Sequence, residues 1–67
     1  MTDIELRIVK LLAEGLKNID LPKILQSEGF EACSLSTIEK SLKKIRATYK
    51  AKTNFHLALI LTKKGII

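Results

Sequence analysis

The stretch Ser34–Lys50 has the sequence SLSTIEKSLKKIRATYK and carries the clearest helical pattern in the chain. Four large apolar side chains recur in it at intervals of four, three and four residues. They are Ile38, Leu42, Ile45 and Tyr49. Side chains at this spacing lie on one face of an α-helix. The pattern therefore predicts an amphipathic helix over about residues 35–50, with this face in the core.

The opposite face of this predicted helix is polar and mostly basic. At about 100° per residue, it consists of Ser36, Lys40, Lys43 and Ala47, flanked by Glu39 and Lys44. An α-helix fits the major groove of DNA, where its outward side chains meet the base edges. Lysine can donate to guanine O6 and N7, and a glutamate can accept from cytosine N4.

Two capping patterns compete for the start of this helix. In one, Ser34 is the N-cap, and Cys33 and Ile38 form a hydrophobic staple across it. In the other, Ser36 and Glu39 form a capping box two residues later. The second pattern would fold Glu39 back onto the helix end, whereas the first leaves it available to a partner. The residues favour neither.

Two helices are predicted before this segment. The first begins at a capping box of Thr2 and Glu5, has its apolar face at Ile4, Ile8, Leu11 and Leu12, and ends at Gly15. The second is short, with Leu21, Ile24 and Leu25 inside and Gly29 at its end. Asn18 or Asp20 can cap it. Pro22 favours Asp20, because proline is tolerated in the first turn of a helix.

A fourth helix is predicted between a cap at Thr53 or Asn54 and a stop at Gly65. Apolar side chains from Phe55 to Leu61 surround it almost completely, and His56 is expected to be an ordinary surface residue. A helix that is apolar on several sides needs more than one cover. The helix therefore serves the core alone, or also offers a surface to a second copy through Leu57, Ile60 and Leu61. The predicted fold is an all-α, four-helix, bundle-like single domain over residues 1–67.

Charge is distributed unevenly along the 67 residues. The net charge is +5, but residues 1–31 carry −2 and residues 32–67 carry +7, with Glu39 as the single acid of the second part. This asymmetry favours a polyanionic partner. A deep enzyme cleft is not expected at this size, and the chain has no catalytic motif. One cysteine and one histidine are too few for a protein metal site. We therefore expect no enzyme activity, cofactor, metal or small-molecule ligand.

The cellular location follows from similar reasoning. A small domain without disulfides suits a reducing compartment. The chain has neither a signal-peptide pattern nor an apolar stretch long enough to span a membrane. A cytoplasmic protein with no membrane partner is expected.

Three strings resemble the LuxR/GerE-type helix-turn-helix domain, the output module of many bacterial response regulators. TDIELRIVKLLAEGL at residues 2–16 is similar to the opening of the family. Ser34, Thr37 and Ile38 match its S-x-x-T-V start of the recognition helix, and KKGII at residues 63–67 looks like its R-R-G-L-I ending. The resemblance covers nearly the whole chain and suggests the C-terminal domain of a longer protein.

This resemblance implies a DNA-binding transcription regulator that acts as a dimer through its fourth helix. It places Glu39, Lys40 and Lys43 against base edges in duplex DNA. It places a second set of residues near phosphates, to which the polar character of the third helix adds Ser36. That second set is Lys17, Asn18, Ser36, Thr37 and Lys44.

The chain departs from the family at three places. The turn Gln26–Ser36 is several residues longer than the usual tight turn, Glu39 replaces a common Lys or Arg, and Asn54 replaces a frequent Arg. A different class of function is therefore kept open, namely a helical protein-interaction module that docks a partner on its apolar fourth helix.

Overall fold

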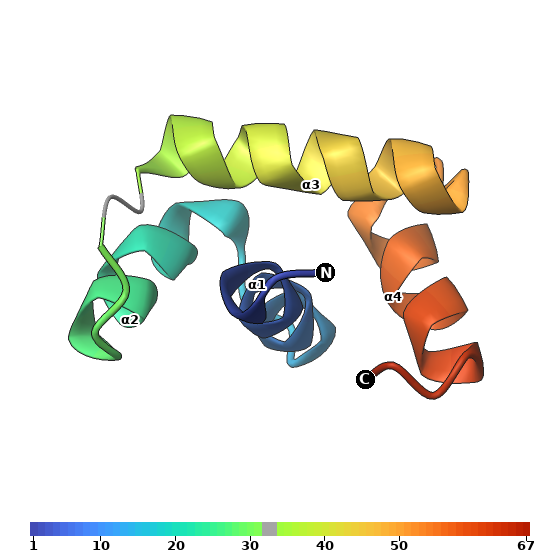
Figure 1. Ribbon diagram of the computed structural model, residues 1–67, viewed down its shortest axis with the longest axis horizontal. Coiled ribbons are helices and arrows are strands. Elements are labelled where there is room, and N and C mark those ends of the chain that lie inside the picture. Colours follow the sequence, from blue (N-terminus) through green and yellow to red (C-terminus); the bar gives the residue numbers. More distant parts are fainter. Residues whose placement is uncertain (32–33) are drawn as a thin grey trace.

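The computed structural model describes residues 1–31 and 34–67, and in these ranges the chain is helical without any strand (Figure 1). Four α-helices and one short 3-10 turn, η1, follow one another along the chain. They are α1 (Asp3–Ala13), η1 (Asn18–Asp20), α2 (Leu21–Ser27), α3 (Leu35–Tyr49) and α4 (Asn54–Lys63). The predicted all-α fold is confirmed.

Helix α1 begins and ends where the sequence predicts. The backbone N–H of Thr2 donates to Glu5 Oε1 at 2.8 Å, and the N–H of Glu5 donates to Thr2 Oγ1 at 3.3 Å. At the other end Gly15 has a φ of +96°, a left-handed conformation that glycine adopts without strain. The N–H of Leu16 then donates back to the carbonyl of Leu11, which closes the helix.

The start of α2 differs in part from the prediction. The α-helix does begin after Asp20, with Pro22 in its first turn. The Asp20 side chain, however, makes no capping hydrogen bond to α2. Its carboxylate instead accepts from the backbone N–H of Lys17 at 3.4 Å, and so closes η1. The 3-10 turn supplies the helical lead-in that a side-chain cap would otherwise provide.

Helix α3 begins by the first of the two capping patterns. Ser34 is the N-cap, and its Oγ accepts from the N–H of Thr37 at 3.2 Å. Ser36 lies inside the first turn, so the alternative capping box of Ser36 and Glu39 is wrong. The predicted staple residue Cys33 lies outside the described residues. Helix α2 ends at Ser27 and α3 begins at Leu35, so both ends of the predicted turn Gln26–Ser36 are helical. Residues 32 and 33 of that turn lie outside the described residues.

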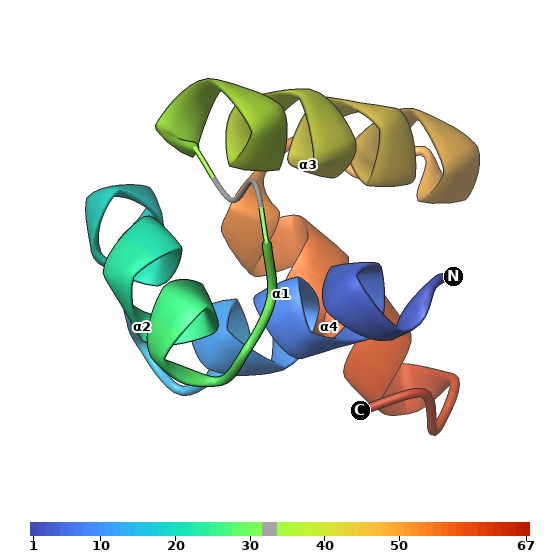
Figure 2. The ribbon, with the colours of Figure 1, turned by 60° about the vertical axis from the view of Figure 1, so that its left-hand side comes forward.

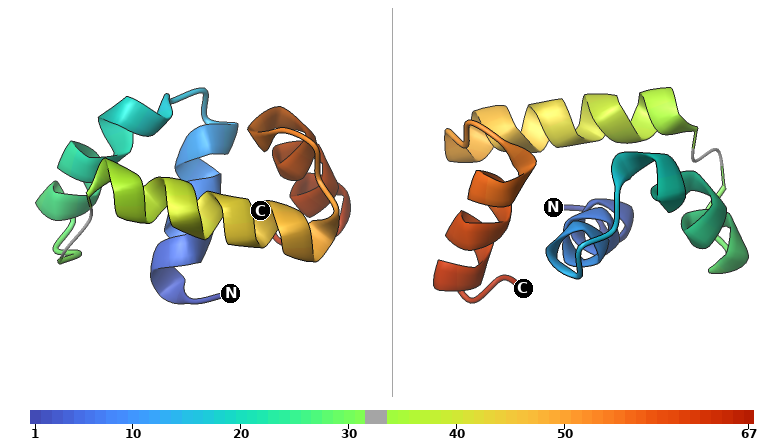
Figure 3. Two further views of the ribbon diagram at one scale, coloured as in Figure 1. Left: turned by 90° about the horizontal axis from the view of Figure 1, so that it is seen from above. Right: turned by 180° about the vertical axis from the view of Figure 1, so that it is seen from behind.

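Helix α3 lies across the other three helices. Figure 1 shows it along the top, with α1 seen end-on beneath it and α2 and α4 to either side. Seen from above, α3 crosses over α1 (Figure 3). Helix α3 contacts α1, η1, α2 and α4, and α1 also contacts α4 (Figure 2). The pair α2 and α3 therefore forms the predicted helix-turn-helix, with α1 and α4 as its support.

All four helices contribute to one core. Its fully buried members are Ile8, Val9, Leu11, Leu21, Leu25, Ile38, Leu42, Ile45, Leu57 and Leu61. Tyr49 is half-buried and packs against this cluster, as its spacing predicts. The described residues bury no polar side chain completely. The core is thus purely apolar, and burial of that surface is what holds the helices together.

Helix α4 corrects one set of predicted residues. Leu57 and Leu61 are only 1% and 0% exposed, so they belong to the core of a single copy and cannot face a second one. Ile60 is half-buried. The apolar side chains that α4 does expose are Phe55, at 75%, and Leu59, at 45%. These two lie on the opposite side of the helix from Leu57 and Leu61.

The start of α4 is a compact polar turn. Thr53 rather than Asn54 is the cap, because its Oγ1 accepts from the N–H of His56 at 3.0 Å. The Nδ1 of His56 in turn accepts from the backbone N–H of Lys52 at 3.0 Å. His56 is therefore half-buried and bound to the turn, rather than an ordinary surface residue.

Candidate nucleic-acid interface

The outer face of α3 is polar, exposed and uncovered. Its exposed residues are Ser36, Thr37, Glu39, Lys40, Lys43, Lys44 and Ala47. In the described part of the chain, no other element lies beyond α3 on this side (Figure 1). Because Ile38, Leu42 and Ile45 hold the opposite face in the core, the orientation of these side chains is set by packing rather than by chance.

The cations on this face are available to a partner. The ammonium groups of Lys40 and Lys43 form no ion pair or hydrogen bond within the described residues. In the front half, by contrast, Arg7 makes a bidentate contact with Glu28, with Nε–Oε1 and Nη2–Oε2 distances of 2.8 and 2.7 Å. This guanidinium lowers the pKa of the Glu28 carboxyl. The excess of basic residues in the second half of the sequence therefore includes lysines on the outer face of α3 that are exposed and, within the described residues, unpaired.

Glu39 also lies on this exposed face. Since α3 begins at Leu35, Glu39 is one turn inside the helix and does not fold back onto its end. Its carboxylate has no hydrogen-bond or ion-pair partner in residues 1–31 and 34–67. It lies one helical turn before Lys43, on the same flank of α3. The lone acid is thus available beside the free lysines.

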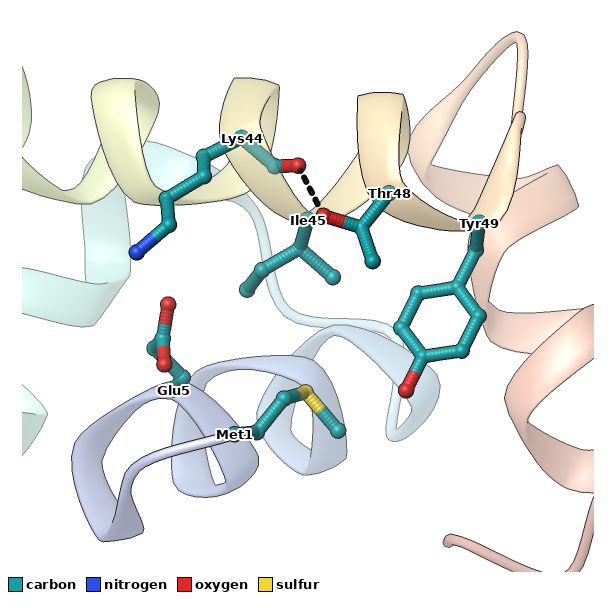
Figure 4. Close-up of a pocket in the computed structure, with 6 residues that line it drawn as sticks. All are labelled: Met1, Glu5, Lys44, Ile45, Thr48 and Tyr49. Atoms are coloured by element: carbon teal, nitrogen blue, oxygen red, sulfur yellow. Dashed lines mark hydrogen bonds between the residues drawn. The ribbon is translucent and has the colours of Figure 1, made fainter.

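Lys44 lies on the other flank of α3 and faces α1. Figure 4 shows its ammonium group turned toward the carboxylate of Glu5, across a small cavity. The cavity is lined by Met1, Glu5, Lys44, Ile45, Thr48 and Tyr49. The hydrogen bond from the backbone N–H of Thr2 lowers the pKa of Glu5, and the charge of Lys44 acts in the same direction. The positive charge of Lys44 is therefore partly offset by an acidic side chain of α1, whereas the charges of Lys40 and Lys43 are not offset in this way within the described residues.

A polar chain of three side chains joins η1, α3 and α4, and sequence reasoning missed it. Asn54 Oδ1 accepts from Arg46 Nη1, and Asn54 Nδ2 donates to Asn18 Oδ1 at 3.3 Å. The side-chain Oδ1 of Asn18, a predicted phosphate contact, is thus engaged inside the protein, whereas its Nδ2, the atom that could donate to a phosphate, donates to no described residue. The sequence contained only a weak indication of this role for Asn54, because an asparagine at the start of a helix is first interpreted as an N-cap. The bond to residue 18 depends on tertiary packing.

The end of η1 and α2 nearest α3 holds the remaining predicted contacts. Lys17 is exposed, and Asn18 is half-buried because of the chain just described. Ile19, which the sequence analysis did not single out, is an apolar side chain that is 70% exposed. Lys17 immediately precedes η1, and η1 contacts α3. The structure therefore places η1 against α3, on the side that faces the other helices rather than on the outer face (Figure 1).

Helix length and the grouping of side chains bear on two other kinds of site, a membrane span and a metal centre. No described helix combines the length and the apolar character that crossing a bilayer requires. Within residues 1–31 and 34–67, no three His, Cys, Asp or Glu side chains gather closely enough to hold a metal ion.

Comparison with known proteins adds no information about the interface. Protein-family models, curated proteins and solved structures contain no match to this chain.

Proposed function

We propose that this protein binds duplex DNA by placing α3 in the major groove, as a bacterial transcription regulator of the LuxR/GerE type. The single observation that carries the proposal is the uncovered face of α3, on which Lys40 and Lys43 are exposed and unpaired within the described residues. A helix of this diameter fits the groove, and its lysines match both phosphates and guanine edges.

The residues divide into two proposed roles. Lys40, Lys43 and Glu39 face the groove and meet base edges. A second set of residues sets the position of the helix through phosphates, which carry no sequence information directly. It consists of Lys17 and Asn18 at the start of η1, Ser36 and Thr37 in the first turn of α3, and Lys44 on the flank of α3. Lys44 contributes less than its charge alone would suggest, because Glu5 lies across from it.

A salt titration with matched double variants tests this proposal. Binding of a fluorescein-labelled random-sequence duplex is followed by fluorescence anisotropy at increasing NaCl. Lys40→Ala with Lys43→Ala removes two charges from α3. Lys63→Ala with Lys64→Ala removes two equally exposed charges at the end of α4 far from α3 (Figure 1). On a random-sequence duplex binding is mainly electrostatic, and the two lysines act there through their charge on phosphates. The α3 pair should therefore weaken binding and lower the salt slope by about two units, since each lost phosphate contact changes it by roughly 0.9.

The control pair should leave affinity and slope nearly unchanged. Equal losses from both pairs would mean that only net charge matters and that α3 is not the binding element. No binding by the unaltered protein at low salt would reject DNA as the partner.

A second proposal concerns α4, and a different observation favours it. Phe55 and Leu59 are exposed and line an open groove between α1 and α4, together with Leu12, Leu16 and Ala58. We infer that this surface pairs two copies, so that two α3 helices read two half-sites. A single small module contacts few base pairs, and pairing increases both affinity and specificity.

Analytical ultracentrifugation tests this pairing. Phe55→Ser with Leu59→Ser should shift the protein from dimer to monomer without loss of helical circular dichroism. Ile19→Ser is the matched control, because it also removes an apolar side chain, 70% exposed, but on η1. A protein that is monomeric before any substitution, at concentrations of hundreds of micromolar, would reject the dimer and favour a docking surface for another protein.

A further inference from the structure

Glu39 is the one acid among residues 32–67, and it lies on the exposed outer face of α3 together with Lys40 and Lys43. A carboxylate on a surface that approaches phosphates weakens binding, because like charges repel. Its helical position would favour a pair with Lys43, since Glu four residues before Lys is the better orientation for such a pair. Yet neither side chain has an ionic partner in the described ranges.

The major groove offers such a carboxylate only one well-matched base. Guanine presents two acceptors, N7 and O6, and thymine presents the acceptor O4 with a methyl group. All of these disfavour a carboxylate. Adenine presents the donor N6, but the acceptor N7 lies directly beside it. Cytosine presents the N4 donor alone, so its edge is the one that a carboxylate contacts without facing an acceptor on the same base.

The partner of cytosine suits the neighbouring lysine. In a C·G pair, guanine O6 and N7 lie on the same groove edge as cytosine N4, and lysine is a common donor to them. Residues four apart on a helix lie next to each other on its surface, about 5–6 Å between Cβ atoms. Both side chains are long and, in this structure, uncommitted. Together they present an acceptor and a donor to the two halves of one base pair.

We propose that Glu39 and Lys43 together recognise one C·G base pair in each half-site, with Glu39 accepting from cytosine N4 and Lys43 donating to guanine O6 or N7. This rests on the proposed function, because it needs α3 in the major groove. In this proposal Glu39 selects a base, and its negative charge lowers the affinity of the protein for DNA of any sequence.

The test uses the full chain and a selected binding site. Sequences are enriched from a random duplex library, and each position of the best site is then varied to all four base pairs. The unaltered protein should prefer C·G at one position by about tenfold, which corresponds to a well-formed polar contact. Glu39→Gln is the deciding variant, because it keeps the shape of the side chain and replaces one acceptor oxygen with a donor. Glutamine matches the N6 and N7 of adenine.

Glu39→Gln should therefore move the preference at that position from C·G to A·T, with the other positions unchanged. Glu39→Ala should abolish the preference there and strengthen binding to random DNA by a few fold. Lys63→Ala, which removes an exposed charge at the end of α4, serves as the control that should leave every base preference unchanged.

Two results would overturn the inference in distinguishable ways. If Glu39→Gln tightens binding but keeps every base preference, Glu39 only tunes charge, while the proposed DNA binding stands. If the unaltered protein shows no binding to any duplex, the proposed function and this inference fail together.

Discussion

At the scale of single residues, Ser34 has the largest consequence for the proposed interface. Its hydroxyl accepts from the N–H of Thr37 and also lies 2.9 Å from the hydroxyl of Thr37. By starting α3 at Leu35, this cap places Glu39 one turn inside the helix. A start two residues later would have turned the same carboxylate toward the helix end. One hydroxyl thus determines whether Glu39 can meet a partner.

Ser34→Ala should lower the free energy of unfolding by about 1 kcal/mol, because the N–H of Thr37 loses its acceptor. Urea denaturation followed by circular dichroism measures this. Ser34→Asp should retain most of the stability, since aspartate caps as well as serine. Ser36→Ala, inside the first turn, is the matched control and should have little effect. A larger loss from Ser36→Ala than from Ser34→Ala would contradict the observed start of α3.

At the scale of elements, α3 performs two tasks with opposite faces. Ile38, Leu42 and Ile45 fix it to the core, and Lys40 and Lys43 project from the other side. Helix α4 shows the same division in a less obvious form, since both of its faces are apolar. Its Leu57 and Leu61 are buried, whereas Phe55 and Leu59 are exposed. The chemistry of a helix face therefore has to be judged together with what covers it.

Leu42→Ala should cost about 2–5 kcal/mol of stability, because Leu42 is 0% exposed and its removal leaves a cavity under the centre of α3. Thermal and urea unfolding both report the loss. Leu59→Ala makes the same chemical change at a side chain that is 45% exposed, and it should cost clearly less. At concentrations low enough to keep the protein monomeric, similar losses from the two variants would mean that α4 packs with its other face inward.

At the scale of the whole molecule, a few polar contacts join helices that the apolar core already holds together. Arg7 of α1 binds Glu28 after α2, and the chain of Arg46, Asn54 and Asn18 joins α3, α4 and η1. The first of these contacts connects the middle of α1 to the end of α2. The second fixes the end of α3 to its neighbours. Such hydrogen bonds and ion pairs depend on orientation and so fix how the helices are placed, whereas burial of apolar surface is non-directional.

The Arg7–Glu28 contact predicts a dependence of stability on pH. Arg7 lowers the pKa of Glu28 below its usual value of 4.5, so the contact stabilises the fold above about pH 4.5. That contribution is lost as the pH falls through the lowered value. Thermal unfolding at pH 7 and at about pH 3 should show a smaller difference for Glu28→Gln than for the unaltered protein.

The control for this measurement is Glu14→Gln, another exposed acid near the end of α1. It should leave the pH dependence nearly intact. Glu5, whose pKa is also lowered, accounts for part of the acid sensitivity that remains in both variants. An unchanged pH dependence in Glu28→Gln would show that the contact with Arg7 adds nothing to stability.

Much of the fold could be predicted because its signals are local. The capping box of Thr2 and Glu5, the stop at Gly15 and the apolar stripe of α3 each depend on residues within a few positions of one another. The candidate site was predicted in the same way, since the face opposite an apolar stripe is exposed. The choice between the two starts of α3 was not available from local patterns, because both were sound.

The amino-acid sequence by itself determined the helices, their order and the basic face of α3, since periodicity and capping act over one or two turns. Packing in three dimensions determined which side of α4 is covered, and it brought Asn18 and Asn54 together across 36 positions of sequence. It also left Glu39 and the lysines of α3 without partners in the described residues. The physical reason is that burial and long-range hydrogen bonds depend on which elements meet, and a helix with two apolar faces does not specify this on its own.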